Sequence, residues 1–130
     1  MNEPVGIVLV SHSADLASGL ADLVGELSGG EVPVLVAAGT DDGRIGTSYD
    51  RVRQAISDAS RGAGVLILPD LGSSVLISRT VLEDHPDPSV VVVDAPFVEG
   101  AVAATLTAST GADLAAVVTA AEEARDVRKF

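Results

Sequence analysis

His12 and Asp70 are the two side chains of this sequence whose types and positions suggest a reaction. Each closely follows a short apolar run, His12 within Ser-His-Ser and Asp70 within Pro-Asp-Leu-Gly-Ser-Ser. A neutral imidazole keeps one ring nitrogen free to attack, while a carboxylate that accepts the other N–H fixes the tautomer and stabilises the cation that attack creates. We therefore predict a histidine nucleophile oriented by an aspartate, provided that the fold brings the two together.

Four near-continuous apolar runs predict the strands that carry these residues. They cover residues 5–10, 32–37, 64–68 and 89–93, and such runs are typical of strands buried on both faces of a parallel sheet. Between them, apolar residues recur at three- and four-residue spacing, which predicts amphipathic crossover helices. The positions are Leu16, Leu20, Leu23, Val24 and Leu27 in the first interval and Val52, Ala55, Ile56 and Ala59 in the second.

Turn and capping residues predict where the helices begin and end. Gly29-Gly30 and Gly62 are expected to end the first two helices, and Thr47 or Ser48 to cap the start of the second. Three further helices are predicted over residues 74–84, 96–109 and 113–128.

This order of elements predicts a doubly wound α/β fold, with a mainly parallel sheet of four or five strands flanked by helices. The 130 residues, 47% of them hydrophobic, suffice for one core, so residues 1–130 are expected to form a single domain. In a flavodoxin-like strand order the first and third strands are neighbours. Ligands of such sheets bind beyond the carboxyl ends of the strands, where the strand order reverses. His12 and Asp70 are then expected side by side at that point.

The loops at the same edge are suited to hold a phosphoryl group. Backbone N–H groups at Ser13, where a helix starts, and around Gly72 predict an anion-binding position. The connection over residues 39–48 is longer than is usual in these folds, and long loops are often functional. Asp70 has a second interpretation, because an aspartate at such a place often caps the next helix through the N–H groups of residues 71–73. The two roles are compatible.

Composition argues against several classes of function. The net charge of −11 opposes binding to nucleic acid or to an anionic membrane surface. There is no cysteine for a disulfide or a thiolate metal site, and no spacing of ligands predicts another metal site. Lys129 is the only lysine, which leaves none for a phosphate-binding P-loop. No apolar stretch approaches the roughly 18 residues of a membrane span, so a cytoplasmic protein is expected.

Four segments, taken in order, resemble the phosphotransfer subunits of phosphoenolpyruvate-dependent dihydroxyacetone kinases, whose N-terminal domains belong to the mannose-type EIIA family. The segments are GIVLVSHSADLASGL, GTDDGRIGTSYDRVRQAI, LILPDLGSS and DAPFVEGAVAA, which extend over nearly the whole chain. The resemblance implies that His12 is phosphorylated, through Nε2, beside the carboxylate of Asp70. It also implies that Gly46-Thr47-Ser48 and Gly72-Ser73 lie on loops that flank the phosphoryl group.

The same resemblance implies the partners. In the family, the histidine takes a phosphoryl group from HPr or an HPr-like domain and passes it to ADP. The ADP is held by the nucleotide-binding subunit of the kinase, which works with a substrate-binding subunit to phosphorylate dihydroxyacetone. The chain itself is thus expected to need no cofactor and no metal, and to form a homodimer.

Two other functions stay open. One is the EIIA domain of a mannose-type sugar permease, which shares the fold and the phosphohistidine but has a different acceptor. The other is a non-enzymatic regulatory module with a flavodoxin-like or receiver-like fold.

Overall fold

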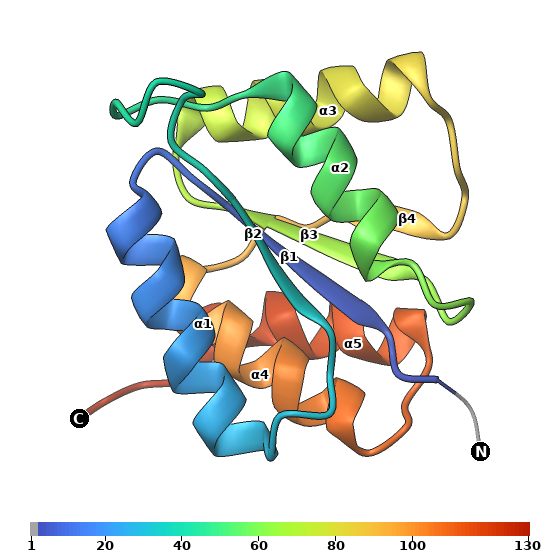
Figure 1. Cartoon of the computed structure of the whole chain (residues 1–130). Helices are drawn as coiled ribbons and strands as arrows, with labels where there is room; N and C mark the ends of the chain where they lie inside the picture. The colour runs from blue at the N-terminus through green and yellow to red at the C-terminus, as the bar shows by residue number, and fades with distance from the viewer. Residues whose placement is uncertain (1–2) are drawn as a thin grey trace.

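The computed structural model describes residues 3–130, and a four-stranded parallel sheet forms its centre. The strands are β1 (Gly6–Ser11), β2 (Val34–Ala38), β3 (Val65–Pro69) and β4 (Val90–Val92). Their order in the sheet is β2-β1-β3-β4, so the two inner strands are the first and the third (Figure 1). The predicted α/β fold and flavodoxin-like strand order are therefore confirmed, with four strands in the described part of the chain.

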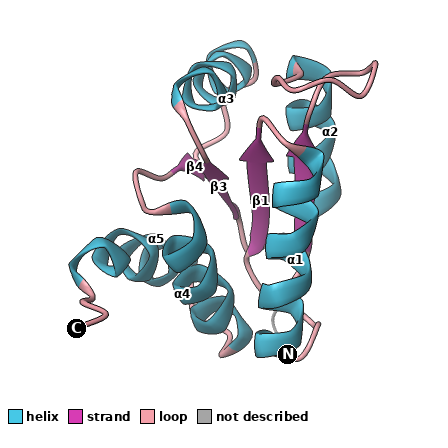
Figure 2. Cartoon of the chain, turned by 90° about the vertical axis from the view of Figure 1, so that its left-hand side faces the viewer, coloured by secondary structure: helices cyan, strands magenta, loops and turns pink. Residues whose placement is uncertain are grey.

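Five helices cover the two faces of this sheet. Both views show that the helices form two groups, one on each face of the sheet (Figures 1 and 2). The first group is α1 (Ala14–Ser28), α4 (Phe97–Ser109) and α5 (Leu114–Glu123), and the second is α2 (Tyr49–Ala59) and α3 (Gly72–Asp84). A short 3₁₀ turn over Ala124–Asp126 follows α5.

The inner strands are mainly apolar because each of their faces is buried against helices. Along β1, Ile7 and Leu9 pack in the core beneath α1, α4 and α5, whereas Val8 and Val10 pack in the core beneath α2 and α3. All four side chains are fully buried. Successive side chains of a strand point to opposite faces, so a strand covered on both faces favours apolar residues along its length, and Ser11 at the end of β1 is the buried polar exception.

Only part of the predicted apolar face of the first helix is buried. The helix buries Ala17, Leu20 and Val24, but Leu16, Leu23 and Leu27 remain 48%, 45% and 52% exposed. The apolar stripe is wider than the strip of helix that the sheet and α4 cover. Spacing alone shows that a helix is amphipathic, but not how much of its apolar face finds a partner.

The second helix ends earlier than predicted. Its C-terminal residue is followed by Ser60, whose backbone N–H and hydroxyl both donate to the carbonyl oxygen of Ile56. Gly62, the predicted end, instead takes a left-handed conformation (φ 98°) in the turn that leads into β3. The predicted end at Gly29 is confirmed, since this glycine closes α1 in the same left-handed conformation.

Candidate active site

The structure brings His12 and Asp70 together at the carboxyl ends of the two inner strands. Val10 of β1 pairs with Pro69 of β3, so the two strands end at the same edge of the sheet. The Nδ1 atom of His12 lies 2.9 Å from Oδ1 of Asp70. The aspartate side chain is only 7% exposed, whereas the histidine side chain is 23% exposed. The imidazole can therefore be reached from solvent while its carboxylate partner is covered.

Five donors surround the Asp70 carboxylate. The hydroxyl of Ser11 and the backbone N–H of His12 donate to Oδ2, at 2.9 and 3.0 Å. The His12 ring, the hydroxyl of Ser74 and the N–H of Leu71 lie 2.9, 2.8 and 2.6 Å from Oδ1. Burial on its own would raise the pKa of Asp70, but the hydrogen bonds from His12 N–H, Ser74, Ser11 and the His12 ring outweigh it and lower the pKa to about 2.

An ionised Asp70 fixes the tautomer of His12. A carboxylate can only accept hydrogen bonds, so this contact favours the neutral tautomer that carries its hydrogen on Nδ1. The lone pair is then on Nε2, which lies beside the hydroxyl of Ser73 at 2.5 Å. In this tautomer Nε2 is the ring nitrogen that is available to a reaction partner at the exposed edge.

The start of α3 offers donors next to this nitrogen. Its N-cap residue, Leu71, makes no side-chain capping bond, and its carbonyl accepts from the N–H groups of Ser74 and Val75. The first N–H groups of a helix, here those of Gly72 and Ser73, have no partner within the helix and attract anions. Asp70 accepts the N–H of Leu71 alone among residues 71–73, so the predicted capping role is only partly met.

The loop over residues 39–48 is tied to the histidine through its second half. The N–H of Gly46 donates to the carbonyl oxygen of His12 at 3.0 Å, and Thr47 forms an isolated bridge with Gly39. The hydroxyl of Thr47 lies 3.0 Å from that of Ser74 rather than at Nε2. The long loop therefore reaches the site through its backbone and through one hydroxyl.

Two of the predicted site residues use their side chains elsewhere. Ser13 and Ser48 are the N-caps of α1 and α2, and their hydroxyls accept from the N–H groups of Leu16 and Arg51. The N–H of Ser13 is also engaged, since it donates to the hydroxyl of Ser11 at 3.1 Å. These serines hold the two helices in place at the edge of the site.

Sequence reasoning missed two residues that the structure brings into contact with Asp70. Ser11 and Ser74 are both fully buried, and each donates its hydroxyl hydrogen to the carboxylate. The signal was available, because serine is mostly exposed and a buried one needs a polar partner. Ser11 ends an apolar run, and Ser74 comes four residues after the aspartate, one helical turn along α3.

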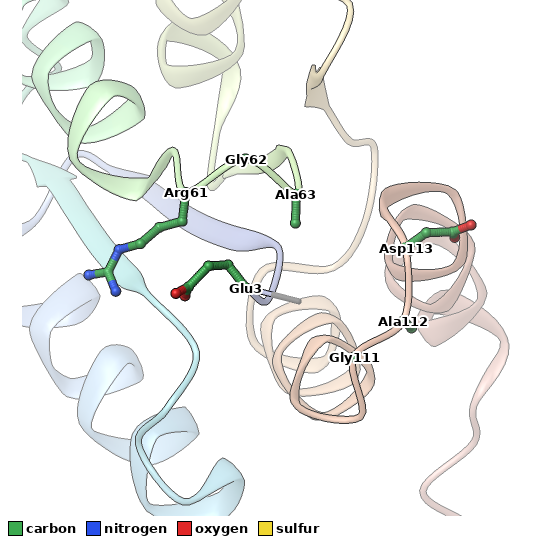
Figure 3. Close-up of a pocket in the computed structure, with 7 residues that line it drawn as sticks. All are labelled: Glu3, Arg61, Gly62, Ala63, Gly111, Ala112 and Asp113. Carbon is green, nitrogen blue, oxygen red and sulfur yellow. The ribbon is translucent and has the colours of Figure 1, made fainter. Parts of the chain in front are cut away.

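Other parts of residues 3–130 offer less for chemistry. No three metal-binding side chains of the described chain gather in one place, and none of its helices has the length and apolarity needed to cross a membrane. A hollow at the opposite end of the sheet is shown in Figure 3. It is lined by Glu3, Arg61, Gly62, Ala63, Gly111, Ala112 and Asp113. The side chain of Asp113 is already used there, as the N-cap of α5.

Comparison with known proteins gives the family. Residues 6–118 match the model of the EIIA-man family, described as the PTS system fructose IIA component. The chain belongs to the EIIA-man family. The matched range contains His12, Asp70 and the loops on both sides of them.

Relatives of this EIIA-man chain carry a more specific description. The phosphoryl donor subunit DhaM of PEP-dependent dihydroxyacetone kinase 1 from Listeria innocua is 40% identical over 103 residues, which cover 79% of the chain and 81% of that protein. DhaM from Providencia stuartii is 36% identical over 132 residues. The match covers 96% of the chain but 28% of that relative, so the chain spans little more than a quarter of this longer protein.

A solved structure agrees with the fold. The crystal structure of a protein described as EF1359, of unknown function, superposes with a TM-score of 0.84 and 31% sequence identity. The superposition covers 95% of both chains.

Proposed function

We propose that this chain is a phosphohistidine carrier that relays a phosphoryl group from HPr, or an HPr-like domain, to ADP on a dihydroxyacetone kinase. The observation that carries the proposal is the geometry of His12, whose Nδ1 lies 2.9 Å from the ionised Asp70 carboxylate while Nε2 lies at the exposed edge. The relatives described as phosphoryl donor subunits support the choice of reaction and of acceptor.

The first half of the relay makes the phosphohistidine. Nε2 of His12 attacks the phosphorus of the donor's phosphohistidine, and a new N–P bond forms as the donor's N–P bond breaks. The electron pair of the broken bond leaves with the donor's ring nitrogen. The ring of His12 then carries a positive charge, which the ionised Asp70 stabilises at a distance of 2.9 Å.

The second half of the relay transfers the phosphoryl group from His12 to ADP. An oxygen of the terminal phosphate of ADP attacks the same phosphorus, the bond to Nε2 breaks, and its electron pair returns to the ring as the lone pair. Transfers of this kind pass through loose transition states that depend on alignment and on charge stabilisation. Asp70 aligns the ring, and Ser73 together with the N–H groups of Gly72 and Ser73 is placed to hold the oxygens of the phosphoryl group.

The remaining site residues hold the loop and the helices around His12 in position. Gly46 and Thr47 place the long loop against His12, and Ser13 and Ser48 cap the helices on either side. In this function the chain binds no cofactor or metal of its own, since the ADP belongs to the nucleotide-binding subunit, and it works as a homodimer in the cytoplasm.

The proposal is tested by the mass of the intact protein after incubation with phosphoenolpyruvate, enzyme I and HPr. We expect a gain of one phosphoryl group, which His12→Gln abolishes. His85→Gln is the matched control, because His85 is the only other histidine and lies exposed at the end of α3. A wild type that gains no mass, or a His12→Gln variant that gains as much as the wild type, contradicts the proposal.

A second incubation decides the acceptor. The phosphorylated protein is mixed with the ADP-loaded dihydroxyacetone kinase subunits and dihydroxyacetone. Loss of the added mass supports the kinase relay. A phosphoryl group that stays in place under these conditions, but is discharged by a mannose-type permease, identifies the chain as a permease component instead.

A further inference from the structure

Ser74 lies at a junction between three separate segments of the chain. Its side chain is fully buried near the start of α3, and its oxygen lies 2.8 Å from Oδ1 of Asp70, 3.0 Å from the hydroxyl oxygen of Thr47 and 3.3 Å from Nδ1 of His12. It therefore connects the ends of β1 and β3 with the long loop. A buried hydroxyl is costly unless it is hydrogen-bonded, and a fully hydrogen-bonded network of buried groups is rigid.

The hydrogens of this cluster can be assigned one by one. The Asp70 carboxylate only accepts, so Ser74 donates its single hydrogen to Oδ1, and so does Nδ1 of His12. With its hydrogen used in this way, Ser74 can only accept from Thr47. The chain of donors thus runs in one direction, from Thr47 to Ser74 and from Ser74 to Asp70.

A different arrangement becomes available when Thr47 does not donate. Donation from Thr47 to a lone pair of Ser74 restricts the direction of the single Ser74 hydrogen, and without it the hydroxyl can rotate until this hydrogen faces Nδ1 of His12, which lies 3.3 Å away. The ring would carry its own hydrogen on Nε2, where the hydroxyl of Ser73 can accept it. In that tautomer the nitrogen facing the exposed edge has no lone pair and cannot attack phosphorus.

We propose that Thr47 and Ser74 are positioning residues whose hydroxyls hold the Asp70 carboxylate in orientation and keep the hydrogen of the His12 ring on Nδ1. This inference deepens the proposed function and rests on it for its effect on phosphoryl transfer. Neither residue touches the phosphoryl group, and Thr47 acts through Ser74. The hydroxyl of Thr47 is thereby distinguished from that of Ser73, which lies at Nε2 itself.

The test compares Thr47→Val with Thr47→Ser. Valine keeps the shape of threonine and removes the donor, whereas serine keeps the donor. Two quantities are measured: the ratio of the two His12 tautomers in the unphosphorylated protein, from the ¹⁵N shifts of the ring, and the rate of phosphorylation by phosphorylated HPr. Since one hydrogen bond is lost, we expect Thr47→Val to lower both by about three- to tenfold without a change in KM for HPr, and Thr47→Ser to restore both.

Further variants complete the design. Thr47→Ala also removes the donor, so it should shift the tautomer ratio in the same direction as Thr47→Val, and it keeps the inference testable if the valine variant folds poorly. Ser74→Ala should not produce this shift, because it also removes the hydroxyl that would donate to Nδ1 of His12. Thr80→Val is the matched control, because the hydroxyl of Thr80 lies exposed on α3 and donates to the carbonyl of Leu76. It should behave as the wild type.

The outcomes separate this inference from the proposed function. A wild type that is phosphorylated, together with a Thr47→Val variant unchanged in tautomer ratio and rate, overturns the inference and leaves the phosphohistidine function standing. An equal loss in Thr80→Val also overturns it, because the effect would then not be specific to the chain of donors. If the wild type takes no phosphoryl group, the proposed function fails, and the tautomer ratio alone decides whether Thr47 and Ser74 position the ring.

Discussion

Replacing Asp70 by asparagine should lower the free energy of unfolding, and the size of this loss should depend on pH. The pKa of Asp70 is lowered from its ordinary value of 3.8 to about 2. One pKa unit is worth about 1.4 kcal/mol, so the ionised carboxylate adds about 2 kcal/mol to the free energy of unfolding near neutral pH. Because the pKa is lower in the folded chain, this contribution is complete above about pH 5 and is lost as the pH falls through 3.8 towards 2.

Asparagine cannot replace the carboxylate in this place. Its amide nitrogen would face donors, either Ser11 and the His12 N–H at one oxygen position or the His12 ring, Ser74 and the Leu71 N–H at the other. The hydroxyls can turn to accept and the His12 ring can change its tautomer, but the backbone N–H groups of His12 and Leu71 can only donate. At least one buried N–H is left facing another donor. The cost of this unsatisfied donor also predicts a loss of about 2 kcal/mol in the free energy of unfolding at pH 7, in agreement with the loss expected from the pKa.

The assay is urea unfolding of the wild type and Asp70→Asn, followed by circular dichroism between pH 7 and pH 2.5. The difference in the free energy of unfolding should be largest above pH 5 and should shrink with falling pH, approaching a total change of about 2 kcal/mol. Ser11→Ala, which removes one donor to Oδ2, should show an intermediate dependence. A difference that stays constant over the whole range would refute the argument that the hydrogen bonds lower the pKa of Asp70.

Two further predictions concern the core. Thr105→Val should raise the free energy of unfolding by about 1 kcal/mol in urea denaturation, because the fully buried hydroxyl of Thr105 has no hydrogen-bond partner among the described residues; a clear loss of stability would contradict this. Gly6→Ala should destabilise the fold by more than about 1 kcal/mol, because the added carbon would overlap the carbonyl oxygen of Ala59. Gly25→Ala, at an open position of α1, should instead stabilise by up to about 1 kcal/mol, and equal effects of the two alanines would show that the close approach is absent.

The sequence predicts the structure best in segments where every residue is buried. The inner strands are buried on both faces, so their composition alone predicts them, and the order of strands and helices then predicts that His12 and Asp70 meet. No comparable pattern marks Ser11 and Ser74. Their part in the site rests on single side-chain hydrogen bonds, which leave no periodicity in a sequence.

Helix ends and partly covered faces are also hard to predict. The second helix ends at Ala59, and the hydroxyl and N–H of the next residue, Ser60, donate to carbonyl groups of the last turn, so Gly62 is not needed as a cap. The leucines of α1 follow helical spacing equally well, yet Leu23 and Leu27 remain half exposed whereas Leu20 is buried. The outcome depends on neighbouring elements whose positions are set by the whole fold.

The attachment of His12 and Asp70 to the inner strands makes the site resistant to local opening. The N–H of Asp70 donates to the carbonyl oxygen of Val10, so the β1–β3 ladder continues up to His12 and Asp70. Inner strands of a sheet separate only when the molecule unfolds as a whole, whereas exposed loop tips open at little cost. The tip of the 39–48 loop can therefore fluctuate, or exchange sequence during evolution, without disturbing the nitrogen that is proposed to carry the phosphoryl group. The pair therefore shares the global stability of the fold, and only the tip of the loop can vary around it.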